Sequence, residues 1–131
     1  MSSGADTTLT NGSVRVVVVD DDSLVRGLIT RALVRAGFVT FEAADGQEGL
    51  DIVLDLAALD EPPAVMVVDR HMPVMDGDEL VREIRAIEEF EFLPIIMMSA
   101  EPGVAGSYDA FVAKPFANSE LISLIATLLK P

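Results

Sequence analysis

Short apolar runs, many of them rich in β-branched residues, constrain the fold of this chain more than any other feature of its sequence. They cover residues 14–19, 38–43, 64–68, 94–98 and 110–113. Most of these runs are apolar throughout rather than at every second residue, which is typical of strands that are buried on both faces. Segments with helical periodicity alternate with them. We therefore predict an α/β fold in which helices cover both faces of a parallel sheet.

Capping residues mark the expected helix boundaries. Gly37 is placed to end the helix that follows the first strand. Asp45 and Asp76 are each followed three residues later by glutamate, which is the spacing of a capping box at a helix N-terminus. We expect Asn118 to cap the last helix.

Composition excludes several classes of function. The 22 acidic and 9 basic side chains give a net charge of −13, which disfavours binding to nucleic acid or to an anionic membrane surface. Cysteine is absent, which excludes disulfides, thiolate catalysis and zinc–thiolate sites and suits a cytoplasmic location. No apolar run approaches the roughly 20 residues that a membrane span needs. We predict a flexible segment over residues 1–13 and one folded domain over residues 14–131.

Polar residues follow four of the apolar runs. Asp20 and Asp21 come after the first run and Asp69 after the third, whereas Ser99 and Lys114 come after the fourth and fifth. The carboxyl ends of parallel strands form one edge of a sheet, and ligands bind there at the point where the strand order reverses. If the strands are ordered 2-1-3-4-5, the three carboxylates meet at that point.

Three ionised carboxylates in one place repel one another and need a compensating cation. Because the ligands would all be oxygen atoms, the cation would be Mg²⁺ rather than zinc. With the metal bound, Asp69 could attack phosphorus as a nucleophile and form an aspartyl phosphate. Ser99 could donate a hydrogen bond to one phosphoryl oxygen, and Lys114 could neutralise another.

Four motifs carry a resemblance to a known family. They are Val-Asp-Asp-Asp at 19–22, Val-Asp-Arg-His-Met-Pro-Val-Met-Asp-Gly at 68–77, Met-Ser-Ala at 98–100 and Ala-Lys-Pro-Phe at 113–116. In this order they closely resemble the receiver domain of two-component response regulators. The resemblance covers residues 14–131. It implies the flavodoxin-like (CheY-like) fold, with a five-stranded parallel sheet of order 2-1-3-4-5.

The resemblance also implies how phosphate and metal are held. Asp69 would be the phosphoacceptor, and a histidine kinase or a histidine phosphotransfer protein would be its donor. Asp21, Asp69 and the backbone carbonyl of His71 would ligate Mg²⁺ directly, whereas Asp20 would act mainly through water. The chain would then signal through phosphorylation-dependent protein–protein interaction, with at most slow phosphoryl transfer and autodephosphorylation of its own.

Further roles follow from the same resemblance. Ser99 and Lys114 would hold the phosphoryl oxygens. Lys114-Pro115 resembles the pair that is joined by a cis peptide bond in the family, so we expect a cis bond here. Phe111 occupies the position of an aromatic switch, whose inward turn accompanies movement of the Ser99 hydroxyl towards phosphate. On its own, Phe111 is more typical of core packing than of a switch.

The segment between the fourth and fifth strands departs from the family pattern. Residues 100–109 give only ten positions and include Pro102, Gly103 and Gly106. A crossover between parallel strands usually takes a dozen or more residues with a helix, and proline and glycine disfavour a helix here. We predict that the family's helix between these strands is shortened or missing, and that residues 101–107 are mobile before phosphorylation.

Two alternatives stay open. The chain could be a degenerate receiver that acts as a constitutive protein-binding module, although its acidic residues, Ser99 and Lys114 are complete. An aspartyl-phosphate hydrolase of the haloacid dehalogenase type needs an aspartate two residues after the nucleophile, where this chain has His71. As a further hypothesis, the His71 ring and Glu101 set how fast water reaches the acyl phosphate.

Overall fold

The computed structural model of the protein describes residues 14–101 and 106–130. The strands are β1 (Arg15–Val19), β2 (Val39–Ala43), β3 (Val65–Asp69), β4 (Ile95–Ser99) and β5 (Ala110–Ala113). The helices are α2 (Ser23–Arg35), α3 (Gly46–Ala58), α4 (Gly77–Arg85) and α5 (Asn118–Leu128), with a short 3₁₀ helix η1 (Glu88–Phe90). The segment 1–13, predicted to be flexible, lies outside the described residues. So do residues 102–105, which make up most of the segment predicted to be mobile.

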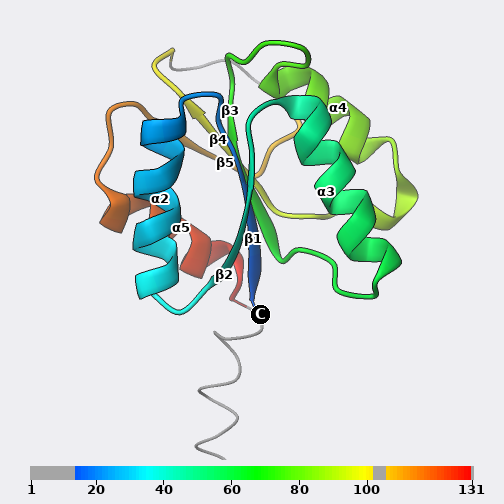
Figure 1. Ribbon diagram of the computed structural model, residues 1–131, viewed down its shortest axis with the longest axis horizontal. Coiled ribbons are helices and arrows are strands. Elements are labelled where there is room, and N and C mark those ends of the chain that lie inside the picture. The colour runs from blue at the N-terminus through cyan, green and yellow to red at the C-terminus, as the bar shows by residue number, and fades with distance from the viewer. Residues whose placement is uncertain (1–13, 102–105, 131) are drawn as a thin grey trace, which may run out of the picture.

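The five strands form one parallel sheet in the order β2-β1-β3-β4-β5. This confirms the predicted α/β class and strand order. The order reverses between β1 and β3, which are neighbours although β2 lies between them in the chain. The carboxyl ends of all five strands lie at the top of Figure 1.

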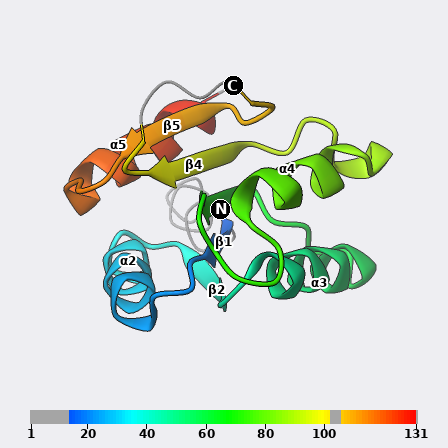
Figure 2. The same ribbon diagram turned by 90° about the horizontal axis from the view of Figure 1, so that it is seen from above.

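Helices cover both faces of the sheet, as predicted. Figure 2 shows α2 and α5 on one face and α3 and α4 on the other. Successive strand residues point to opposite faces, so Val16 and Val18 of β1 pack with α2 and α5, whereas Val17 and Val19 pack with α3 and α4. Two apolar cores therefore hold the sheet from both sides. None of the helices in the described ranges is long and apolar enough to cross a membrane.

Most of the predicted helix caps are confirmed. The Asp45 side chain accepts a hydrogen bond from the Glu48 amide at 2.8 Å, and Asp76 accepts one from the Glu79 amide at 2.9 Å. The Asn118 prediction is wrong, because Asn118 is the first helical residue of α5 and Ala117 is the N-cap, without a side-chain hydrogen bond. The two positions differ by one residue, which composition alone does not distinguish.

The connection from β4 to β5 contains no helix among its described residues, 100–101 and 106–109. The described connection is instead fastened to the body of the protein by Arg85, the last residue of α4. Arg85 donates hydrogen bonds to the Ser107 carbonyl at 2.9 Å and to the Asp109 carboxylate at 2.8 Å. The same carboxylate accepts a hydrogen bond from the Ile95 amide at 2.8 Å. Hydrogen bonds of the Arg85 and Asp109 side chains thus hold the start of β5.

Candidate functional site

The structure brings three of the predicted site residues together at the carboxyl edge of the sheet. Val19 of β1 pairs with Val68 of β3, so the residues that follow them lie side by side. Asp20 and Asp69 are buried and Asp21 is exposed. One carboxylate oxygen from each of the three lies within 4.8 Å of the others.

Hydrogen bonds from the side chains of Asp22 and Arg26 hold the loop that carries Asp20 and Asp21. Asp22 caps α2 by accepting hydrogen bonds from two amides of its first turn. One turn into the helix, Arg26 donates to the Asp20 carbonyl at 2.6 Å and to the Glu42 carboxylate at 2.9 Å. The loop is therefore fixed between α2 and β2. Sequence reasoning missed Arg26, because its partners are a backbone carbonyl and a residue on another strand.

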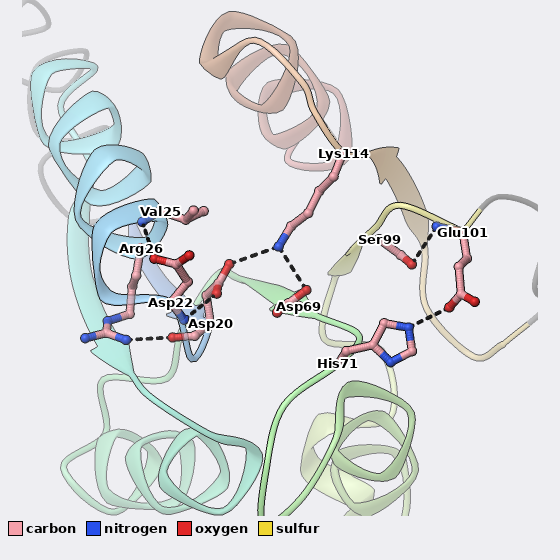
Figure 3. Close-up of polar contacts among 9 residues, drawn as sticks. All are labelled: Asp20, Asp22, Val25, Arg26, Asp69, His71, Ser99, Glu101 and Lys114. Carbon is pink, nitrogen blue, oxygen red and sulfur yellow. Dashed lines mark hydrogen bonds and ion pairs between the residues drawn. The ribbon is translucent and has the colours of Figure 1, made fainter.

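Lys114 reaches the acidic cluster from the end of β5. Its Nζ lies 3.0 Å from Oδ1 of Asp69 and 3.3 Å from Oδ2 of Asp20, as Figure 3 shows. The peptide bond between Lys114 and Pro115 is cis, as expected from the resemblance. Only one cation among the described residues therefore faces three carboxylates.

This imbalance of charge is reflected in the pKa values of the bonded pair. Burial raises the pKa of Asp69, and the charges of Asp20 and Asp21 add to this, while the hydrogen bond from Lys114 opposes it. Burial alone would lower the pKa of Lys114, but its hydrogen bonds and charge contacts with Asp69 and Asp20 outweigh burial and raise that pKa. The site therefore favours additional positive charge.

The donor set fits a hard divalent cation. All three clustered side chains offer carboxylate oxygens, and neither histidine nitrogen nor sulfur is among the possible ligands of the cluster. Oxygen ligands with an open, partly exposed position suit Mg²⁺, which keeps several of its waters when bound. The exposed carboxylate of Asp21 gives the cluster such an open side.

Ser99 lies on the other side of Asp69 from Asp20 (Figure 3). It is buried at 1% exposure, and its hydroxyl oxygen accepts a hydrogen bond from the Glu101 amide at 3.0 Å. The Glu101 carboxylate in turn lies 2.5 Å from Nε2 of His71, and both of these side chains are exposed. The loops that follow β3 and β4 are thus tied together beside Asp69.

Phe111 is half-buried and packs against the core on the α3 and α4 face. Its ring centroid lies 6.4 Å from that of Tyr108, a residue that sequence reasoning did not single out. Arg70, which directly follows Asp69, contacts the same tyrosine and was also missed. The local sequence holds no signal for Arg70, because its contact with Tyr108 joins residues that are 38 positions apart.

Gly77 allows the backbone after Asp69 to pack closely against the start of α4. A Cβ atom at this position would lie 2.5 Å from the Asp69 carbonyl and 2.8 Å from Cα of Arg70. The Gly77 amide also donates a hydrogen bond to the Arg70 carbonyl at 2.8 Å. The sequence Asp76-Gly77 therefore caps a helix and at the same time fixes the main chain that carries Asp69.

Comparison with known proteins identifies the family. Residues 16–126 match the response regulator receiver domain. This chain belongs to that family, which agrees with its sheet order and with the motifs at its strand ends.

Curated relatives at similar identity include two kinds of regulator. Response regulator MprA of Mycolicibacterium vanbaalenii is 37% identical over 124 residues, which is 89% of this chain and 51% of the relative. Transcriptional regulatory protein PrrA of Mycobacterium tuberculosis is 35% identical over 125 residues, which is 90% of this chain and 51% of the relative. The chain thus spans about half the length of the curated relatives it matches.

Solved structures share the fold. The chemotaxis response regulator CheY4 of Vibrio cholerae superposes with a TM-score of 0.78 at 29% identity, covering 88% of this chain and 98% of that chain. The receiver domain of sensor histidine kinase PA1611 of Pseudomonas aeruginosa gives a TM-score of 0.76 at 27% identity, with 88% and 96% covered. The latter structure contains a magnesium ion coordinated in its active-site cleft.

Proposed function

We propose that this receiver domain accepts a phosphoryl group on Asp69, with Mg²⁺ bound, from a histidine kinase or a histidine phosphotransfer protein. One observation carries the proposal above all. Asp69 is a buried carboxylate that shares a single lysine with Asp20, within a cluster of three carboxylates. Membership of the family and the magnesium in the related PA1611 receiver domain support the same assignment.

In the proposed reaction, a carboxylate oxygen of Asp69 attacks phosphorus while the bond from phosphorus to the donor nitrogen breaks. The product is an acyl phosphate, and the donor histidine keeps the electron pair of the broken bond. Asp21, Asp69 and the His71 carbonyl would hold the Mg²⁺ directly, with Asp20 acting mainly through water. The bound ion would neutralise charge on the phosphoryl oxygens.

Lys114 and Ser99 complete the proposed phosphoryl site. Lys114 already donates to Asp69 at 3.0 Å and would neutralise a phosphoryl oxygen as a point charge. The Ser99 oxygen accepts a hydrogen bond from Glu101, so its O–H group remains able to donate to phosphate. The switch role of Phe111 and the effect of His71 and Glu101 on hydrolysis stay predictions.

We propose that the phosphodonor protein docks on a groove beside Lys114. This open groove has a volume of about 490 Å³ and lies between α2 and the start of α5, bounded by Leu28, Lys114 and Phe116. A donor that brings phosphohistidine to Asp69 must rest on the surface around the site, and this groove, lined largely by apolar side chains, shares Lys114 with the site. Leu28 is 52% exposed there, so its side chain is available to a partner.

The docking proposal predicts that Leu28→Asp slows transfer from any histidine kinase that phosphorylates the wild-type chain. Labelling by acetyl phosphate should stay unchanged, because a small donor does not need the groove. Leu54→Asp is the matched control, since Leu54 is 42% exposed on α3, across the sheet from the groove. Equal slowing by both variants, or by neither, would contradict the docking surface.

The phosphoacceptor proposal is tested by incubating the protein with Mg²⁺ and acetyl phosphate. We expect an acid-stable, base-labile phosphate that is lost in Asp69→Asn and retained in Asp45→Asn, a half-buried aspartate that caps α3. Removal of Mg²⁺ by a chelator should prevent labelling. If the wild-type chain takes no label, the alternative of a constitutive protein-binding module is favoured.

A further inference from the structure

Arg70 is a buried cation directly after the proposed phosphoacceptor. Its side chain is only 3% exposed, and it turns towards α4 and the segment before β5. The Arg70 amide donates to the Met98 carbonyl, and its own carbonyl accepts from Gly77, so the main chain at this residue is fixed. Any change in the contacts of Arg70 must therefore come from its side chain.

The guanidinium of Arg70 is poorly satisfied. Its Nε lies 3.4 Å from the Asp78 carboxylate and Nη2 lies 3.5 Å from the Tyr108 hydroxyl, but Nε and Nη1 have no hydrogen-bond partner. Arg85 provides a contrast on the same helix layer, because its guanidinium makes four hydrogen bonds. Buried donors without partners are costly, so the observed arrangement of the Arg70 side chain is destabilised relative to one that pairs these donors.

Tyr108 connects Arg70 to the start of β5. The guanidinium carbon of Arg70 lies 5.7 Å from the centroid of the Tyr108 ring, which is within the range of a cation–π contact. The same ring packs against Phe111 of β5. On either side of Tyr108, the Ser107 carbonyl and the Asp109 carboxylate are held by Arg85, so the ring can respond while its backbone stays in place.

We propose that Arg70 and Tyr108 form a switch that transmits the phosphorylation state of Asp69 to the surface before β5. The inference rests on the proposed function. A phosphoryl group adds negative charge to the residue directly before Arg70. The guanidinium, whose Nε and Nη1 have no hydrogen-bond partner, is then drawn away from the tyrosine ring. Tyr108 then loses its cation–π contact and changes the surface formed by residues 106–109, directly before β5.

The chain has one tyrosine and no tryptophan, so its tyrosine fluorescence reports on Tyr108 alone. The test adds Mg²⁺ and beryllium fluoride, a tetrahedral mimic of the phosphoryl group, and follows binding separately by fluorine-19 NMR. We expect binding to change the fluorescence of the wild-type protein. In Arg70→Met the fluorescence should start near the value of the bound wild type and no longer respond.

Arg82→Met is the matched control, because Arg82 is an exposed arginine of α4 and its loss should leave the response intact. If Arg70→Met does not fold, Arg70→Lys keeps the charge but lacks the planar group, and its response should be strongly reduced. A full response in both Arg70 variants would overturn the switch. So would bound beryllium fluoride without a fluorescence change in the wild type, a result that leaves the proposed function standing. Absence of binding would overturn both.

Discussion

Burial and the hydrogen bond from Lys114 have opposite effects on the pKa of Asp69, and together they set its charge state. Burial raises the pKa of Asp69 above its ordinary value of 3.8, and the hydrogen bond from Lys114 recovers only part of that shift. The folded protein therefore binds this proton more tightly than the unfolded chain does. The contribution of Asp69 to the free energy of unfolding is largest below pH 3.8 and is lost as the pH rises through the folded pKa.

This sign predicts that Asp69→Asn is more stable than the wild type at pH 7 in the absence of Mg²⁺. The reason is that asparagine does not carry the buried negative charge. The difference in melting temperature should shrink as the pH falls below 3.8, where Asp69 is protonated in both states. Thermal unfolding over a pH series checks this. Asp45→Asn should show little change, since asparagine also caps a helix well, and a less stable Asp69→Asn at neutral pH would contradict the account.

Single residues also show how far sequence reasoning reaches. The placement of the three carboxylates, Ser99 and Lys114 at one edge of the sheet was predictable. Each follows an apolar strand, and the carboxyl ends of parallel strands share one edge. The contacts of Arg26 and Arg70 were not predictable, because they involve partners from other elements. Nothing in the local sequence around Arg70 shows that Tyr108, 38 residues later, will lie over it.

At the scale of elements, glycines at helical positions have opposite roles in α2 and α3. Gly27 is an exposed residue of α2, and a Cβ atom there would meet nothing within 4 Å. Gly49 of α3 packs against β1, and its Cβ would lie 2.9 Å from Cγ2 of Val19. One glycine only weakens its helix, whereas the other lets the helix approach the sheet.

We therefore predict that Gly27→Ala raises the free energy of unfolding by roughly 0.5–1 kcal/mol, because alanine loses less backbone entropy in a helix. Gly49→Ala should lower it by about 1–3 kcal/mol through overpacking against Val19. Chemical denaturation of the two variants measures both values. Stabilisation by Gly49→Ala would show that α3 does not sit as close to β1 as the structure has it.

The elements themselves were largely predictable, and their exceptions have physical reasons. Buried parallel strands leave a strong apolar signal, so the five runs and the class of fold could be read from the sequence. The absence of a helix from the described part of the connection between β4 and β5, residues 100–101 and 106–109, could be predicted from the short length of this connection, its proline and its glycines. The contacts that hold the described part of this connection could not be predicted, because the hydrogen bonds of Arg85 to Ser107 and Asp109 join residues more than 20 positions apart.

At the scale of the whole molecule, the acidic residues behind the net charge of −13 have different effects in different places. Three carboxylates are concentrated at one edge of the sheet with one lysine, and a bound cation would relieve their repulsion. Acidic residues elsewhere, such as those at the starts of α3 and α4, cap helices and favour solubility.

We predict that Mg²⁺ raises the melting temperature of the protein, because a ligand that binds only the folded state stabilises it. At a concentration about a hundredfold above the dissociation constant, the gain is about 2.7 kcal/mol. Asp21→Ala should abolish the rise, whereas Asp51→Ala, an exposed position of α3, should keep it. A rise of equal size in Asp21→Ala would place the metal elsewhere.

The central claim is that Asp69 is the phosphoacceptor, and the most direct test is to locate the phosphate at residue resolution. After incubation with Mg²⁺ and acetyl phosphate, borohydride reduces an aspartyl phosphate to homoserine, which peptide mass spectrometry can assign to one position. The account predicts homoserine at position 69, dependent on Mg²⁺. Homoserine at another aspartate, or none in protein that has bound Mg²⁺, would contradict it.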